Sequence, residues 1–410
     1  MRKIFGLLCL LTALSCREPL LESTPRFMRE QDRFARNVGQ QKDQVPADPG
    51  SPGYTPSLYV TALHFRDSVD WRRDSLGAAE VLFFKNGELV RQEPVASPPD
   101  PERHRIWKGQ LWTDYTDGRE TVLLCNGEER LRYEGEELLR GFLLLDGDIH
   151  TLGQRPGNEG FCYRINGKVI YSRDKATILG GPSAPEWRGG ALMLDDQQVY
   201  YSFSVPVQLK DKIGREYHVM RGGDALQTIP VGTYDALYDL RVRGGVVWMA
   251  ARRGEQVCLV CGDKEYYLNV SGNNLFSYQL VPYGEEVMAK GNTLHTGQIC
   301  TTWYYEMGQL SIKVFRTGRS QKVLSVLGEN NRLFVDVDTQ GLVTQFLRND
   351  VDECIPRGQF TCAMPLDLFA SGEHYAAAFT HISDTNHLVI CDGEQFPYSF
   401  NGYFTSVIVE

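Results

Sequence analysis

The 410-residue sequence lacks the clustered basic residues that a nucleic-acid-binding protein needs. It has 43 Lys and Arg against 52 Asp and Glu, a formal net charge of -9, and no run of five or more basic residues. Because a nucleic-acid backbone calls for a basic patch or stripe, this composition argues against nucleic acid as a partner.

The sequence also lacks an apolar run long enough to cross a membrane as a helix, which takes about 20 residues. The run from Ile4 to Leu14 follows Arg2 and Lys3 and ends just before Cys16. This pattern predicts a signal peptide over residues 1–15. Ala13-Leu14-Ser15-Cys16 resembles the lipobox of bacterial lipoproteins, although Leu is usual where Ala13 stands. We therefore expect Cys16 to carry a lipid anchor; the alternative is an ordinary signal peptide cut near Ser15.

Recognisable catalytic and metal-binding motifs are missing. The sequence contains no nucleophile elbow, HExxH, P-loop or EF-hand pattern, and its eight histidines form no pair at i, i+2 or i, i+4. Cys258-x-x-Cys261 has no second CxxC, and on one strand an odd separation points the two side chains to opposite faces. Cys354 and Cys362 could pair, but the other mature cysteines are expected to be buried thiols. We predict no cofactor and no metal.

What is present is a repeat of paired strands joined by tight turns. The segment from Phe142 to Ser172 reads as four strands, and Asn166-Gly167 is the strongest short signal for a β-hairpin. Such turns recur at positions 87, 127 and 167, then at 222, 262, 308, 350 and 393. Intervals of 40 to 55 residues are typical of four-stranded propeller blades. The sequence therefore predicts an all-β propeller with eight blades, and a count of seven stays open.

The two ends of the repeat region indicate how the ring closes. The first unit begins at its second strand (LYVTALHF), whereas the last is followed by a surplus strand, Tyr403 to Val409. We expect this strand to join the first blade, because closure removes large open sheet edges. Residues 57–410 then form one propeller. Residues 16–56, rich in polar residues, Pro and Gly, form a flexible tether.

Long connections are expected on one face of the propeller, the face where sites usually lie. They are residues 66–79, 96–105, 154–160, 176–189 and 206–216, mostly in blades 1 to 3 and the junction into blade 4. The candidate binding residues there are Asp70, Trp71, Arg72, His104, Glu186 and Trp187. An exposed indole can stack on a sugar ring or anchor a protein contact. Each could equally be structural, with the indoles capping their own loops and His104 solvated or buried.

The chain resembles a group of uncharacterised β-propeller lipoproteins from Bacteroidetes-type bacteria. The resemblance rests on the lipobox-like leader and on the recurring element FKNGELV, LCNGEER and INGKVIY, preceded by segments such as GDIHTLG. It implies a propeller anchored in the outer membrane of the cell envelope, and it implies no particular reaction. Blades 4, 6 and 7 depart from the Asn-Gly form.

Two functions remain open. The first is a binding or scaffolding module that engages a glycan or a protein through the long connections. The second is a periplasmic or surface polysaccharide hydrolase or lyase, with loop carboxylates or histidines as acid and base. The first is favoured because no set of catalytic residues is recognisable, so we expect a protein that is not an enzyme. Propeller folds serve both classes.

Overall fold

The computed structural model describes residues 56–66, 79–95, 103–116, 119–179, 191–210 and 213–271, then 275–409 with gaps of one to four residues. Within these ranges the regular structure consists of β-strands and one short 3-10 turn, η4 (Pro156–Asn158). No helix of the described residues is long and apolar enough to cross a membrane. The all-β prediction is confirmed.

Blade 3 shows how the local sequence makes one unit. Its strands are β8 (Leu138–Leu145), β9 (Asp148–Gln154), β10 (Gly160–Ile165) and β11 (Lys168–Asp174), paired antiparallel in the order β11-β10-β9-β8. Asn166 and Gly167 have φ values of 50° and 79°. Positive φ at both central residues defines the type I′ turn, so the hairpin predicted from Asn-Gly is confirmed.

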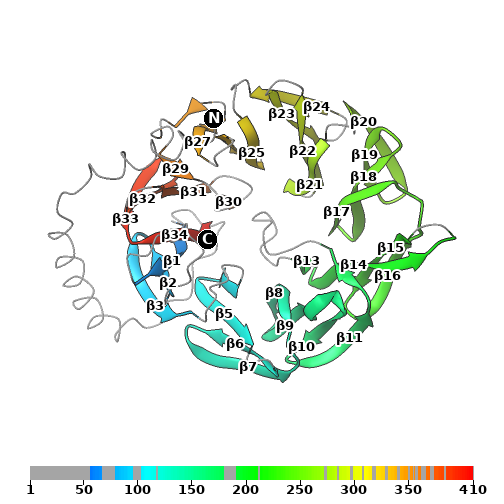
Figure 1. Ribbon diagram of the computed structural model, residues 1–410, viewed down its shortest axis with the longest axis horizontal. Coiled ribbons are helices and arrows are strands. Elements are labelled where there is room, and N and C mark those ends of the chain that lie inside the picture. Colours follow the sequence, from blue (N-terminus) through cyan, green and yellow to red (C-terminus); the bar gives the residue numbers. More distant parts are fainter. Residues whose placement is uncertain are drawn as a thin grey trace, which may run out of the picture. The chain divides into compact units, whose positions relative to one another are not determined.

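The described strands form eight such sheets, arranged from an inner strand A to an outer strand D (Figure 1). Blade 1 contains β34 (Gly402–Val409), β1 (Leu58–Phe65), β2 (Ala79–Lys85) and β3 (Glu88–Pro94), and blade 2 contains β4 (His104–Trp107), β5 (Gln110–Thr116), β6 (Glu120–Cys125) and β7 (Glu128–Glu134). Blade 4 contains β12 (Thr177–Ile178) and β13 (Met193–Asp195), then β14 (Gln198–Gln208), β15 (Ile213–Arg221) and β16 (Asp224–Ile229).

The remaining blades follow the same order. Blade 5 contains β17 (Ala236–Arg243), β18 (Val246–Arg253), β19 (Gln256–Cys261) and β20 (Lys264–Ser271), and blade 6 contains β21 (Leu275–Tyr283), β22 (Glu286–His295), β23 (Ile299–Glu306) and β24 (Gln309–Phe315). Blade 7 contains β25 (Ser320–Leu327), β26 (Arg332–Asp338), β27 (Val343–Arg348) and β28 (Val351–Asp352), and blade 8 contains β29 (Phe360–Thr361), β30 (Leu366–Phe369), β31 (His374–His381), β32 (Asn386–Cys391) and β33 (Glu394–Ser399). The sheets succeed one another around a ring, as a β-propeller requires (Figure 1). Their number matches the larger of the two blade counts left open by the sequence.

The repeated turn residue has a second role that explains why it is Asn or Asp. In blade 1 the Asn86 backbone N–H donates to the Leu58 carbonyl (2.7 Å), and the Leu58 N–H donates to Asn86 Oδ1 (2.7 Å). The same pair of bonds joins Asn126 to Leu111, Asn166 to Ile149, Asn349 to Arg332, and Asp392 to Tyr375. Glycine at 222 and 262 keeps only the backbone bond. We call this arrangement the turn clamp; it ties the C–D turn to strand B.

The C-terminal strand closes the ring as predicted. β34 pairs antiparallel with β1, from Leu58 opposite Val409 to His64 opposite Gly402 (Figure 1). Phe404, Val407 and Val409 are buried in the cluster that blade 1 shares with blade 8. The hydroxyl of Thr405 also donates to that of Thr61 at 2.8 Å. The last strand of the chain is therefore an integral part of the first blade.

Neighbouring blades pack through dry aromatic layers. Between blades 3 and 4, Phe161 and Tyr163 from β10 meet Tyr201 and Phe203 from β14, with ring centroids 4.8 Å apart for Phe161–Phe203 and 4.9 Å for Tyr163–Tyr201. Burial of each such ring contributes about 2–3 kcal/mol. These contacts fix one blade against the next and make the ring a firm base for its connections.

The described cysteines behave as the spacing predicts. Cys125, Cys162, Cys258, Cys261 and Cys391 are not joined in disulfides. Cys258 is fully buried while Cys261 is half-buried, in keeping with opposite faces of β19. Cys354 and Cys362, which could pair, lie outside the described residues.

Candidate binding face

The candidate face is the side of the propeller from which the B–C and D–A connections leave; we call it the long-connection face. Since the strands are antiparallel, the A–B and C–D turns leave from the opposite side. The three longest stretches between described strands are residues 66–78, 95–103 and 179–192. The first two are on the long-connection face, at blade 1 and its junction with blade 2, as the sequence predicted. The third was expected on the same face, but it interrupts inner strand A of blade 4, because β12 and β13 on either side of it both pair with β14.

Two of the predicted connections are partly strand. Residues 206–216 were expected to be a loop, but β14 and β15 continue through them as a ribbon, with Pro206 opposite Arg215 and Gln208 opposite Ile213. The ribbon runs past β16, whose pairing with β15 begins at Tyr217. Pro206 and the charged residues that follow it obscure the alternation that marks a strand. Thr177 and Ile178 likewise form β12 instead of a loop.

The candidate residues of the sequence analysis are not all placed. Asp70, Trp71, Arg72, Glu186 and Trp187 lie outside the described residues, as does Cys16. His104 is described, and it belongs to β4 and not to the preceding connection. Its side chain is buried, and Nδ1 lies 3.2 Å from the Thr113 hydroxyl. The sequence left open a binding role and a structural role for His104, and this position favours the structural role.

At blade 1 the face carries a cluster around Glu80. Arg66 and Gln92 both donate to the buried Glu80 carboxylate. The hydrogen bond from Arg66 is the main reason that the Glu80 pKa is lowered. Nearby, His64 Nδ1 accepts the Asn401 N–H at 3.2 Å, and burial lowers the His64 pKa. The cluster holds in place the residue at which connection 66–78 begins.

At blade 2 a buried carboxylate organises two arginines. The Asp114 side chain is fully buried, and it lies 3.1 Å from Arg105 Nη1 and 3.8 Å from Arg103 Nη1. Arg105 also donates to the Leu139 carbonyl of blade 3 at 2.6 Å. One negative charge thus faces two positive ones beside the inner strand β4. This is where connection 95–103 joins the blade.

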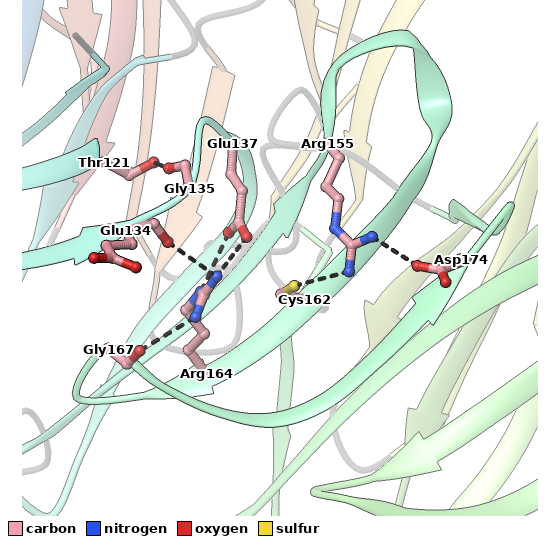
Figure 2. A network of polar contacts seen from close by, with 9 residues as sticks. All are labelled: Thr121, Glu134, Gly135, Glu137, Arg155, Cys162, Arg164, Gly167 and Asp174. Atoms are coloured by element: carbon pink, nitrogen blue, oxygen red, sulfur yellow. Dashed lines mark hydrogen bonds and ion pairs between the residues drawn. The ribbon is translucent and has the colours of Figure 1, made fainter. Parts of the chain in front are cut away.

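Between blades 2 and 3 lies a buried ion pair (Figure 2). Arg164 Nη2 donates to Glu137 Oε1 at 2.8 Å, and the two side chains are only 9% and 2% exposed. The guanidinium also donates to the Gly167 and Glu134 carbonyls and lies 4.5 Å over the Tyr133 ring. Burial lowers the Arg164 pKa, but the bond to Glu137 and its charge outweigh burial, so the pKa is raised overall.

Glycine makes room for this pair. A Cβ at position 153 would lie 2.8 Å from the Glu137 Cβ, closer than real Cβ contacts. Figure 2 also shows that Thr121 donates to the Gly135 carbonyl, which fixes the short connection between β7 and β8. Partners from adjacent blades far apart in sequence form the network, so no local spacing could have marked Glu137 or Arg164.

A second contact in Figure 2 secures the connection after β9. Arg155 donates to Asp174 at 2.7 Å and to Cys162 Sγ at 3.5 Å. Burial raises the pKa of the Cys162 thiol, which keeps it protonated and unreactive. The contact is structural, because it joins the start of this connection to the end of β11.

Gln154 joins two of the connections. Its buried side chain donates to the Gly160 carbonyl at 2.6 Å and to the Ala176 carbonyl at 3.2 Å, and it accepts the Ile178 N–H at 3.0 Å. One amide therefore fastens connection 155–159 and the start of the crossing into blade 4. Sequence reasoning missed Gln154, because a single polar residue at a strand end carries no signal.

These clusters have the chemistry of supports. Each carboxylate described above has an arginine partner, and the described residues contain no group of three or more His, Cys, Asp or Glu side chains that could hold a metal ion. The described part of the face therefore holds the strand ends from which connections leave.

Comparison with known proteins identifies no family. No protein-family model and no curated protein matches the sequence. Among solved structures, BamB from Moraxella catarrhalis has 14% identity and a TM-score of 0.43, covering 78% of this chain and 91% of that one. The dihydro-heme d1 dehydrogenase NirN has 11% identity and a TM-score of 0.45, with 90% and 77% covered. The β-propeller domain of the Trilobed protease from Pyrococcus furiosus has 9% identity and a TM-score of 0.40, with 66% and 84% covered. Similarity at this level does not indicate a shared activity.

Proposed function

We propose that the protein is a lipid-anchored module of the cell envelope that binds a glycan or a protein through its long-connection face. The observation that carries the proposal is the asymmetry of the ring. Two of the three longest connections, 66–78 and 95–103, leave the same face at blades 1 and 2, whereas the opposite C–D connections between described strands are two-residue turns. Loops held by a rigid scaffold are the usual place for binding residues.

The supports under these connections strengthen the proposal. The Glu80 cluster, the Asp114 cluster and the Gln154 side chain each hold a strand end from which a connection leaves. Pre-ordered loop ends reduce the entropy that a ligand must offset on binding. Trp71 and Trp187, on connections 66–78 and 179–192, are the aromatic residues that would contact a sugar ring or a protein anchor.

A binding screen with matched variants tests the ligand site. The full-length protein, Trp71→Ala, Trp187→Ala and Tyr267→Ala would be applied to a glycan array and to envelope extracts analysed by crosslinking. Tyr267 is an exposed aromatic on outer strand β20, so it controls for loss of any surface ring. Binding that falls at least about tenfold in the tryptophan variants and stays unchanged in Tyr267→Ala is expected. Equal binding by all four proteins would contradict the assignment of the face.

The same samples distinguish binding from catalysis. Released products would be sought after incubation with the glycans that bind. Turnover by the wild type that is lost in Asp70→Asn or Glu186→Gln would show that the protein is a hydrolase or lyase and not a binding module.

The anchor needs a separate experiment. Cys16→Ser should abolish incorporation of labelled palmitate and release the protein from membranes. An unlabelled wild-type protein would refute the anchor and leave the binding face untouched.

A further inference from the structure

The outer strand of each blade is a sheet edge with unpaired backbone groups, and such edges are normally protected by charge or proline. Strand β7 of blade 2 has charged residues at five positions, namely Glu128, Glu129, Arg130, Arg132 and Glu134. Strand β33 of blade 8 has Pro397 in its middle. These edges resist the addition of another strand.

Strand β11 of blade 3 is built differently. It is the end strand of its sheet, and between Lys168 and Arg173 it has four uncharged residues, Val169 to Ser172. Val169 is 44% exposed and Ile170 is 41% exposed. β-branched residues in an extended strand favour pairing with a further strand. The centre of this edge therefore lacks the charged residues and the proline found in β7 and β33.

A β-bulge determines which part of this edge is open. Tyr163 pairs with Tyr171 and Arg164 pairs with Val169, so Ile170 is the extra residue. Its side chain lies toward Gly223 in the C–D turn of blade 4 and is still 41% exposed. From Tyr171 to Asp174 the register is regular. Strand β16 of blade 4 has the same bulge, with Leu226 as the extra residue at 39% exposure. β16 thus provides a matched site within the same protein.

The charge around β11 is positive in a protein whose net charge is -9. Lys168 begins the strand, Arg173 lies near its end and Lys175 follows it, and all three are exposed. The one acidic residue of the strand, Asp174, is paired with Arg155. At the matched site, β16 begins with Asp224 and has no basic residue. Charge therefore separates two edges that are otherwise alike.

We propose that β11 is a docking edge for an extended acidic polypeptide segment, which adds to blade 3 as a fifth strand. The backbone of the segment pairs with Tyr171 to Asp174, its uncharged centre contacts Val169 and Ile170, and its flanking carboxylates meet Lys168, Arg173 and Lys175. Strand addition to an open edge takes affinity from main-chain hydrogen bonds and specificity from alternate side chains. This surface is the outer rim and is independent of the long-connection face.

The test uses a synthetic peptide, Glu-Glu-Thr-Val-Thr-Val-Glu-Glu, labelled with a fluorophore and titrated with the full-length protein. Binding is measured by anisotropy, and the contact is located by hydrogen exchange. We expect saturable binding with slowed exchange at residues 169–174. Two control peptides should bind at least about tenfold more weakly than this one. The first has Lys in place of every Glu, and the second has Pro in place of the second Thr.

Substitutions in β11 and β16 test whether the peptide binds at the edge of blade 3. Ile170→Lys and Arg173→Glu should each weaken binding at least about tenfold, whereas Leu226→Lys should leave it unchanged. Circular dichroism confirms that each variant is folded, which is expected because all three side chains are exposed. Absence of binding by the wild type at millimolar peptide, equal binding of the lysine peptide, or an equal loss in Leu226→Lys would overturn the proposal.

Discussion

Removal of strand β34 is expected to open the propeller, and the structure provides the magnitude. Deletion of residues 402–410 removes Phe404, Val407 and Val409, whose side chains are buried between blades 1 and 8. Full burial of an apolar side chain contributes about 1.5–3 kcal/mol, so the three together contribute about 5–9 kcal/mol. A domain typically has about 5–15 kcal/mol of net stability. The deletion is therefore expected to cost most of it.

The deletion also uncovers an edge. Residues 58–64 of β1 now pair with β34, and without it their backbone groups would be free to join another chain. We expect the truncated protein to aggregate on expression, which size-exclusion chromatography and sedimentation will detect. A truncated protein that is soluble, monomeric and melts in a single cooperative transition would refute the closure argument.

Two single substitutions refine the measurement. Phe404→Ala creates a cavity and should cost about 3–5 kcal/mol. Tyr403→Ala, at a partly buried position of the same strand, should cost less than half as much because less of its side chain is removed from water. Urea titration followed by tryptophan fluorescence gives both values, and equal costs would show that burial of β34 does not govern its contribution.

Three further perturbations have defined outcomes. Gly222→Asn should restore the turn clamp to Val199 and stabilise by about 0.5–1.5 kcal/mol in urea titration, because φ is 56° and no atom lies within 4 Å of a new Cβ, whereas Gly222→Ala should destabilise. Glu137→Gln should cost about 3–5 kcal/mol by leaving Arg164 buried without its carboxylate, and Glu137→Gln combined with Arg164→Met should recover part of that cost. The free energy of unfolding should fall in acid, because the lowered pKa of partly buried His64 contributes fully above about pH 6.5 and less as the pH drops through that pKa. Glu80, whose pKa is also lowered, adds a further loss below about pH 4.5. His64→Gln should flatten the part of the urea-midpoint profile that is due to His64.

The fold could be predicted because its signal is local and repeated. Asn-Gly specifies a type I′ turn through backbone preference alone, and Asn166-Gly167 shows this with positive φ at both positions. The closing strand was predictable from a simple count, since the first unit lacked a strand and the last had one too many. The turn clamp was not predicted, because it depends on where the Asn side chain points relative to strand B.

The supports of the candidate face could not be predicted, since each joins residues from different strands or connections at spacings that no sequence pattern marks. Glu137 and Arg164 are 27 positions apart, and Gln154 bonds to Ile178 24 positions away. The ribbon of β14 and β15 was mistaken for a loop because Pro206 and its charged neighbours are also typical of loops.

Closure of the ring and order at the candidate face meet at Asn401. Its carbonyl accepts the Phe65 N–H at 2.8 Å, its side chain donates to the Phe65 carbonyl at 3.1 Å, and its own N–H donates to His64 at 3.2 Å. Phe65 is the last residue of β1, immediately before connection 66–78. The segment that completes blade 1 therefore also fixes the start of a long connection. Damage to the closing strand should disturb the binding face before the rest of the ring, because the two share these three hydrogen bonds.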